Sequence, residues 1–159
     1  EIVRMSNSFI SRNRVRSKKV IISARGGGGA IRFHCAADAG DEAGIIGRVL
    51  NEKRDNLSCA VLYRNNYQGE TILRLLPGAD LKASLLTMHG SKGLEFDTVI
   101  IAGVADSIIP DRETHIEDER RLFYVALTRA KSELHIIYRK NTRGELPRFV
   151  RECGYKGGR

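Results

Sequence analysis

The chain has 159 residues, of which 42% are hydrophobic and 29% are charged, and its formal net charge is +8 at pH 7. This length and composition predict one globular domain and exclude a disordered or fibrous chain. No apolar run has membrane-spanning length and no signal peptide is visible, so we expect no membrane contact. The excess of basic residues suits a polyanionic partner.

Three scattered cysteines (Cys35, Cys59, Cys153) have neither paired metal spacing nor an even count for disulfides. They favour a reducing, cytoplasmic compartment and no metal site. The first residue is Glu1 rather than methionine, so we expect the chain to be a fragment.

Hydrophobic periodicity gives the predicted elements. Residues 1–13 have apolar positions at 2, 5, 9 and 10, which predicts a short amphipathic helix. The basic run at 12–19 is typical of a solvated surface or a nucleic-acid patch. The four glycines at 26–29 predict a surface loop, because a strand follows them, whereas a phosphate-binding P-loop opens a helix.

The rest of the chain alternates between apolar runs and helical stripes. The predicted strands cover residues 31–36, 58–63, 84–88, 98–103 and 135–138. The predicted helices cover residues 41–53, 68–76, a segment from about 115 to 130, and 146–153. This alternation predicts an α/β three-layer sandwich with a mainly parallel sheet and right-handed crossovers. We expect residues 1–153 to form this domain and residues 154–159 to be a disordered tail.

The helix that ends in Thr128-Arg129-Ala130 contains an arginine in an unexpected place. Thr114 and Glu117 have capping-box spacing, which predicts a start near His115. At 100° per residue one apolar arc forms from Leu122, Phe123, Val125, Ala126, Leu127 and Ala130. Arg129 falls inside this arc, where a guanidinium is costly unless it reaches an anion. The arginine either snorkels or pairs internally, for example with Asp118, or it binds an external anion.

Polar residues follow two predicted strands, at the end of the sheet where α/β folds bind ligands. Arg64 and Asn66 suit phosphate and base-edge contacts, with Tyr63 or Tyr67 as a stacking face, although an ordinary polar turn also explains them. The loop from Thr87 to Glu95 carries hydroxyl, imidazole, ammonium and carboxylate groups between glycines that let the backbone approach phosphates.

Three segments resemble motifs of one family, in that family's order. Residues 89–96 (His-Gly-Ser-Lys-Gly-Leu-Glu-Phe) resemble motif V of the superfamily 1 DNA helicases of the UvrD, PcrA and Rep type. Residues 119–131, with Glu-Arg-Arg-Leu and Tyr-Val-Ala-Leu-Thr-Arg-Ala-Lys, resemble motif VI. Residues 60–66 resemble the intervening motif that touches single-stranded DNA. The resemblance covers most of residues 58–138 and implies the second RecA-like motor domain of such a helicase.

The resemblance also implies roles for individual residues. Arg129 is implied as the arginine finger at the ATP γ-phosphate, a type of contact that speeds cleavage by roughly 10³ to 10⁵. Gly93 and Glu95 are implied at the nucleotide, with Glu95 accepting hydrogen bonds from ribose hydroxyls. Arg121 either supports the same phosphates or pairs within its helix, which we favour. The implied DNA contacts are Arg64, Asn66, Thr87, His89 and Lys92.

The chain lacks two signatures of a complete ATPase: it has no Gly-x-x-x-x-Gly-Lys-Ser/Thr and no apolar strand that ends in paired acids. In the family, both lie in a first RecA-like domain, which would bind most of ATP and Mg²⁺. The family's Asn-Tyr-Arg-Ser phosphate sensor would end just before Glu1. The accessory domain that many relatives insert near residues 77–84 is absent.

The resemblance therefore implies the C-terminal motor domain of an ATP-dependent 3′–5′ DNA helicase that acts on single-stranded and duplex DNA in replication and repair. It also implies a nucleoid-associated location in a bacterial-type cell. The isolated chain should not hydrolyse ATP. Two alternatives stay open: a helicase subunit of a recombination nuclease complex, and a non-catalytic nucleic-acid-binding module.

Overall fold

The computed structural model describes residues 1–14, 29–53, 57–76 and 81–158. In this part of the chain a five-stranded sheet has the order β1-β5-β4-β2-β3, and every neighbouring pair of strands is parallel. The strands are β1 (Ala30–Cys35), β2 (Cys59–Tyr63), β3 (Ser84–Thr87), β4 (Phe96–Val104) and β5 (Ala130–Tyr138). The helices are α1 (Ile2–Ile10), α2 (Ala39–Asn51), α3 (Asn66–Leu75), α4 (Ile116–Leu127) and α5 (Arg148–Glu152).

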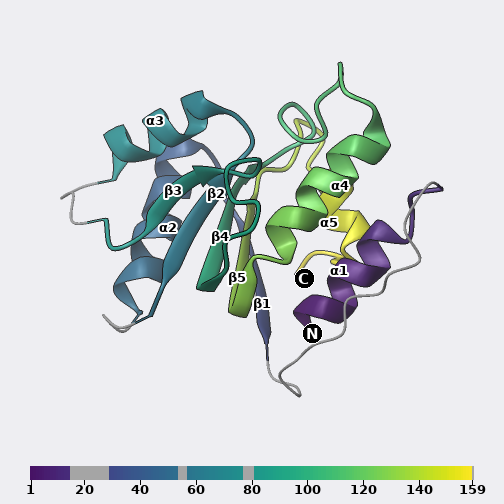
Figure 1. Cartoon of the computed structure of the whole chain (residues 1–159). Coiled ribbons are helices and arrows are strands. Elements are labelled where there is room, and N and C mark those ends of the chain that lie inside the picture. Colours follow the sequence, from purple (N-terminus) through teal and green to yellow (C-terminus); the bar gives the residue numbers. More distant parts are fainter. Residues whose placement is uncertain (15–28, 54–56, 77–80, 159) are drawn as a thin grey trace.

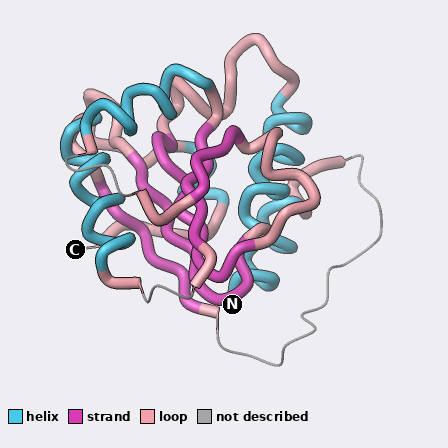
Figure 2. The backbone as a smooth tube through the Cα atoms, turned by 60° about the vertical axis from the view of Figure 1, so that its left-hand side comes forward, coloured by secondary structure: helices cyan, strands magenta, loops and turns pink. Residues whose placement is uncertain are grey.

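The helices cover both faces of the sheet, as Figures 1 and 2 show, with α2 and α3 on one face and α1, α4 and α5 on the other. This confirms the predicted α/β three-layer sandwich and its parallel sheet. Successive residues of a strand point to opposite faces, and the two hydrophobic clusters follow that rule. In β4, for example, Val99 and Ile101 belong to one cluster, whereas Ile100 and Ala102 belong to the other.

Three phenylalanines hold the helices of one face together. Phe9 of α1, Phe123 of α4 and Phe149 of α5 are all 0% exposed, and their ring centroids lie 5.1 to 5.3 Å apart. Tilted and edge-on contacts of this kind are the favoured geometry of aromatic pairs. The short α5 is thereby fixed beneath α4.

Two predicted boundaries near Arg129 are wrong. The helix ends at Leu127 with Thr128 as its C-cap, and Ala130 already begins β5, paired with Phe96 of β4. The prediction failed because residues 131–133 are polar and hide the first half of the strand from any hydrophobicity pattern. Arg129 therefore lies at a helix–strand junction rather than on the apolar arc of the helix.

The start of α4 agrees with the predicted position near His115, but the expected capping box does not form. The His115 side chain accepts a hydrogen bond from the Glu117 backbone N–H at 3.3 Å, and it is the N-cap in place of Thr114.

The structure describes residues 154–158 of the segment that was expected to be a disordered tail. Tyr155 stacks on Phe33 of β1 with ring centroids 4.3 Å apart, and it contacts Tyr138 of β5 edge-on. The basic run beyond Arg14, the first three glycines of 26–29 and part of the 77–84 segment lie outside the described residues. Within the described part of the chain, no helix combines the length and apolarity needed to cross a membrane.

Candidate nucleotide and DNA interface

The sequence-predicted site residues lie at two opposite ends of the sheet, not at one. Tyr63 and Thr87 are register partners at the carboxyl ends of β2 and β3, so residues 64–66 and 88–90 start from that end. Ala130 and Phe96 are partners at the amino ends of β5 and β4, which places Arg129 there. With a rise of about 3.3 Å per residue, the two ends are roughly 20 Å apart.

The segment from Met88 to Glu95 connects these two ends. Its first backbone N–H, on Met88, donates to the Tyr63 carbonyl at the carboxyl end of β2 (2.8 Å). Its Leu94 carbonyl accepts from the Arg129 guanidinium at the amino end of β5 (2.9 Å). Met88 and Ser91 are 0% exposed, so the segment is anchored in the core as it passes along the sheet. One stretch of eight residues therefore reaches both candidate sites.

Arg129 folds back over the end of α4. Its Nε donates to the Val125 carbonyl at 3.0 Å, its Nη1 to the Leu94 carbonyl at 2.9 Å, and its Nη2 to the Thr128 hydroxyl at 3.1 Å. The bond to Val125 satisfies one of the carbonyls that every helix leaves free at its C-terminus. Arg129 is half-buried and makes no ion pair with any carboxylate of the described residues; the internal pair with Asp118 does not form.

A guanidinium carries five N–H donors. Three of the Arg129 donors are used by neutral oxygens of its own chain, which leaves two N–H groups and an uncompensated positive charge. This is a site that an anion can complete without displacing a carboxylate.

Gly93 and Glu95 lie beside Arg129 through the Leu94 contact. Gly93 has φ +83°, a conformation that residues with a Cβ rarely adopt, and a Cβ there would meet no atom within 4 Å. Glu95 is exposed, and the Leu94 side chain is 45% exposed.

Arg121 does not lie with Arg129, Gly93 and Glu95. It lies eight residues before Arg129, about 12 Å along the helix, and it pairs with Asp118 and Glu117 of its own helix. The structural pairing that we favoured for Arg121 is therefore observed.

At the carboxyl end of the sheet, the backbone of residues 64–66 is held by one buried side chain. The Gln68 Oε1 accepts from the backbone N–H groups of Arg64 (3.1 Å) and Asn65 (2.9 Å). Asn66 and Tyr67 open α3 with exposed side chains, and Tyr67 is 55% exposed. Tyr63 is only 9% exposed and packs in the core, so of the two tyrosines only Tyr67 offers a stacking face.

The adjacent turn presents the remaining predicted contacts. The Thr87 Oγ1 accepts from the Gly90 backbone N–H at 3.0 Å and shapes the turn. The buried Ser91 hydroxyl donates to the Met88 carbonyl at 2.7 Å and fixes it from below. His89 and Lys92 are exposed, so an imidazole and an ammonium group face solvent. They follow β3, which is the neighbour of β2, the strand that precedes Asn66 and Tyr67.

Arg64 has a partner that the sequence did not reveal. Its Nε and Nη2 donate to the two carboxylate oxygens of Glu119 of α4, at 3.2 and 2.9 Å, in a forked ion pair. The side chains are 15% and 2% exposed. Glu119 also accepts from the Asp111 backbone N–H at 3.0 Å. The 55-residue separation of Arg64 and Glu119 leaves no local signal by which sequence patterns could have found the pair.

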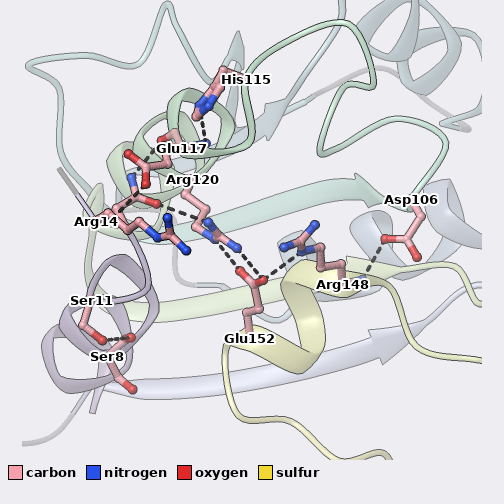
Figure 3. Close-up of polar contacts among 10 residues, drawn as sticks. Ser8, Ser11, Arg14, Asp106, His115, Glu117, Arg120, Arg148 and Glu152 are labelled. Atoms are coloured by element: carbon pink, nitrogen blue, oxygen red, sulfur yellow. Dashed lines mark hydrogen bonds and ion pairs between the residues drawn. The ribbon is translucent and has the colours of Figure 1, made fainter. Parts of the chain in front are cut away.

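The next residue of α4 makes a second forked pair, in another direction. Arg120 donates through Nε and Nη2 to the Glu152 carboxylate of α5 at 2.8 and 2.9 Å, and Arg148 donates to the same carboxylate (Figure 3). The hydrogen bond to Glu152 raises the pKa of Arg120. Burial alone would raise the pKa of Glu152, but the bonds from Arg120 and Arg148 outweigh burial and lower the pKa overall. Glu119 therefore links α4 to the turn after β2, and Arg120 links α4 to α5.

Three buried polar atoms without a hydrogen-bond partner lie near the carboxyl end of the sheet. Glu42 of α2 and Gln68 of α3 are 4% and 5% exposed, and Glu42 Oε2, Gln68 Nε2 and Arg139 Nε have no hydrogen-bond partner within the described residues. Burial raises the pKa of Glu42, partly offset by the Arg139 charge and by a bond from the Gly103 N–H. Gly103 has φ +67°, and a Cβ there would lie 2.0 Å from Gln68 Nε2.

A histidine pair lies on the α2 side of β1 and β5. His34 and His135 stack, with Nε2 and Nδ1 3.0 Å apart, and His135 contacts Glu133, which pairs with Lys53. Burial lowers the pKa of both imidazoles. In the described ranges, no group of three or more His, Cys, Asp or Glu side chains is arranged to hold a metal ion.

Fold and site define a RecA-like α/β domain whose polar loops lie at both ends of a parallel sheet. Residues 78–141 match the family model described as the UvrD-like helicase C-terminal domain. This match covers 64 of the 159 residues and confirms the resemblance to helicases of the UvrD, PcrA and Rep type.

Several curated proteins are similar to parts of the chain. The ATP-dependent DNA helicase Rep of Buchnera aphidicola is 46% identical over 61 residues, which are 36% of this chain and 10% of that protein. The probable DNA helicase II homolog of Mycoplasma capricolum is 55% identical over 64 residues, 37% of this chain and 9% of that protein. The ATP-dependent DNA helicase srs2 of Schizosaccharomyces pombe is 32% identical over 110 residues, 60% of this chain and 12% of that protein. The chain thus spans about a tenth of these relatives.

Among solved structures, the C-terminal domain of a possible DNA helicase from Lactobacillus plantarum has a TM-score of 0.57 and 16% sequence identity. The similarity covers 94% of this chain and 91% of that one. It therefore extends the agreement in fold over nearly the whole chain.

Proposed function

We propose that the chain is the second RecA-like motor domain of an ATP-dependent DNA helicase, and that Arg129 is its arginine finger. The observation that carries the proposal is the state of the Arg129 guanidinium. It is held by three neutral oxygens, makes no ion pair with a carboxylate of the described residues and keeps two N–H donors for an anion. A finger needs this combination, because it must be oriented before the γ-phosphate arrives and must not be neutralised by its own domain.

The residues around Arg129 fit a nucleotide. Gly93 keeps the backbone bare next to the guanidinium, and the exposed Glu95 offers oxygens for ribose hydroxyls. In this proposal Arg129 binds and orients the terminal phosphate, while Gly93 and Glu95 hold the sugar end. Arg121 would reach the phosphates only if it left Asp118, so we assign it to helix stability first.

Catalysis requires a second body. The sequence has no P-loop and no apolar strand that ends in paired acids, so we propose that a first RecA-like domain binds Mg²⁺ and most of ATP, and that the isolated chain is inactive. When bound, Mg²⁺ neutralises charge that develops on the phosphates. The two domains would close around ATP and open after hydrolysis.

At the carboxyl end of the sheet, we propose a track for single-stranded DNA. Asn66, Thr87, His89 and Lys92 would contact phosphates and sugars, and Tyr67 would stack on a base. Arg64 is not among the proposed contacts, since Glu119 holds two of its donor atoms. By analogy with the family we also propose 3′–5′ polarity and a role in replication or repair.

The test uses the complete helicase that carries this chain. Arg129→Ala should lower DNA-stimulated kcat by roughly 10³ or more and leave the Kd for single-stranded DNA nearly unchanged. Arg129→Lys keeps the charge but not the forked geometry, and it should also be strongly impaired. Arg121→Ala, on the helix that precedes Arg129, is the matched control and should retain most turnover.

Unchanged turnover in Arg129→Ala would remove the finger assignment. Polarity is tested separately by strand displacement from duplexes with a 3′ or a 5′ tail.

A further inference from the structure

We infer that the Arg64–Glu119 ion pair is a positioning pair, which connects the DNA-side turn to α4, the helix that Arg129 directly follows. The inference rests on the proposed function and adds to it the regulation of the nucleotide site by DNA. Neither residue is assigned a contact with ligand. Arg64 acts through Glu119, and Glu119 acts through α4.

The first step is the state of the Arg64 guanidinium. Nε and Nη2 are bound to the Glu119 carboxylate, Nη1 lies 3.5 Å from the Asn65 side-chain oxygen, and the side chain is 15% exposed. A phosphate contact from Arg64 would therefore compete with a carboxylate that is 2% exposed and would be left buried without its partner. The geometry favours a permanent internal pair over a direct DNA contact.

The second step is the direction of α4. Glu119 lies in the half of the helix near the carboxyl end of the sheet, and Arg129 follows the helix at the amino end. The two residues are ten positions apart, roughly 15 Å along a helix. A helix packed along one side moves as a stiff body, so a shift imposed at Glu119 reaches Arg129.

The third step is that the contacts form a closed circuit. Arg64 binds Glu119 on α4, and Arg129, which follows α4, binds the Leu94 carbonyl. Leu94 belongs to the segment 88–95, which begins with Met88. The Met88 N–H binds the carbonyl of Tyr63, the residue before Arg64. Both routes between the two ends of the sheet, helix and loop, are thus joined at both ends. DNA bound at Asn66 and Tyr67 would set the position of Arg129 through this circuit.

The neighbouring pair Arg120–Glu152 supplies a matched control. It is forked, similarly buried and begins one residue later on the same helix, but it leads to α5 rather than to the DNA-side turn. A general loss of packing would affect both pairs alike, whereas a role in coupling is specific to Arg64 and Glu119.

The experiment measures DNA-free ATPase, DNA-stimulated kcat, the Kd for single-stranded DNA and the thermal midpoint in the complete helicase, for Glu119→Gln, Arg64→Ala and Glu152→Gln. We expect Glu119→Gln and Arg64→Ala to lose stimulation by DNA by about tenfold or more, with DNA-free turnover and Kd within about twofold of the parent, since neither residue touches a ligand. Glu152→Gln should keep stimulation despite a comparable fall in thermal midpoint. The exchanged pair Arg64→Glu with Glu119→Arg should recover part of the stimulation.

Three results would overturn the inference. The first is equal loss of stimulation in Glu152→Gln, and the second is full stimulation in Glu119→Gln. The third is a weaker Kd in Arg64→Ala with the salt slope reduced by about one, the signature of a lost phosphate contact. If Arg129→Ala is inactive while any of these occurs, the proposed function stands and only the coupling fails. If Arg129→Ala is fully active, the proposed function itself fails.

Discussion

The ion pair between Arg120 and Glu152 gives a stability prediction that can be worked from the structure. The two side chains are 8% and 11% exposed and are joined by two bonds of 2.8 and 2.9 Å. Breaking a buried pair from one side leaves an uncompensated charge, which typically costs about 3 to 5 kcal/mol. Because both ends retain some solvent access and Arg148 also bonds Glu152, we expect Glu152→Gln to lose about 3 kcal/mol, at the low end of that range.

For a domain of this size, such a loss lowers the thermal midpoint by roughly 6 to 12 °C. Urea denaturation followed by circular dichroism measures the free energy of unfolding. The variants Arg120→Leu and Glu152→Leu and the double variant complete a thermodynamic cycle. The double variant should lose less than the sum of the single variants, because it buries no lone charge. A loss below about 0.5 kcal/mol in Glu152→Gln would mean that the pair behaves as an exposed one, and would refute the reasoning from burial.

Three further predictions concern the fold. Gly103→Ala should lower the free energy of unfolding by about 2 kcal/mol or more, because its φ of +67° and the 2.0 Å approach of Gln68 Nε2 both oppose a Cβ. Gly93→Ala has open space for the Cβ and should lose only about 1 kcal/mol in the same denaturation assay. Burial lowers the pKa of His34 and His135 below 6.5, so the unfolded chain binds more protons below that pH. The urea concentration at the unfolding midpoint should therefore fall as the pH is lowered from about 7.5 to about 5.5, and it should fall less steeply in His135→Gln. Phe149→Ala should lose about 3 to 5 kcal/mol by calorimetry, because the ring is 0% exposed between two others.

The sequence predicted β2 and β4 well because these strands are buried on both faces. The apolar runs before Arg64 and after Phe96 have no alternative to a strand in an α/β fold, and a glycine with φ +83° in the 88–95 segment agrees with the loop predicted there. By contrast, the first half of β5 is polar, so its start was missed and Arg129 was placed on a helical arc.

Residue types near the candidate site can be read from the sequence, but their contacts cannot. Periodicity places Glu119 and Arg120 in the first turns of α4, where acidic and basic residues are ordinarily solvated. In the structure each is buried because its partner arrives from a distant part of the chain, Arg64 for one and Glu152 for the other. Contacts between residues 55 and 32 positions apart depend on topology, which one sequence does not encode locally.

The length of α4 is constrained as well as its side chains. Nine residues separate Glu119 from Arg129, and inserting one more would swing the distal guanidinium by about 100° around the helix axis and advance it by about 1.5 Å. Either displacement would remove Arg129 from the Leu94 carbonyl, even with every functional group still present. Insertions and deletions in this interval should therefore be tolerated far less than substitutions on its solvent side.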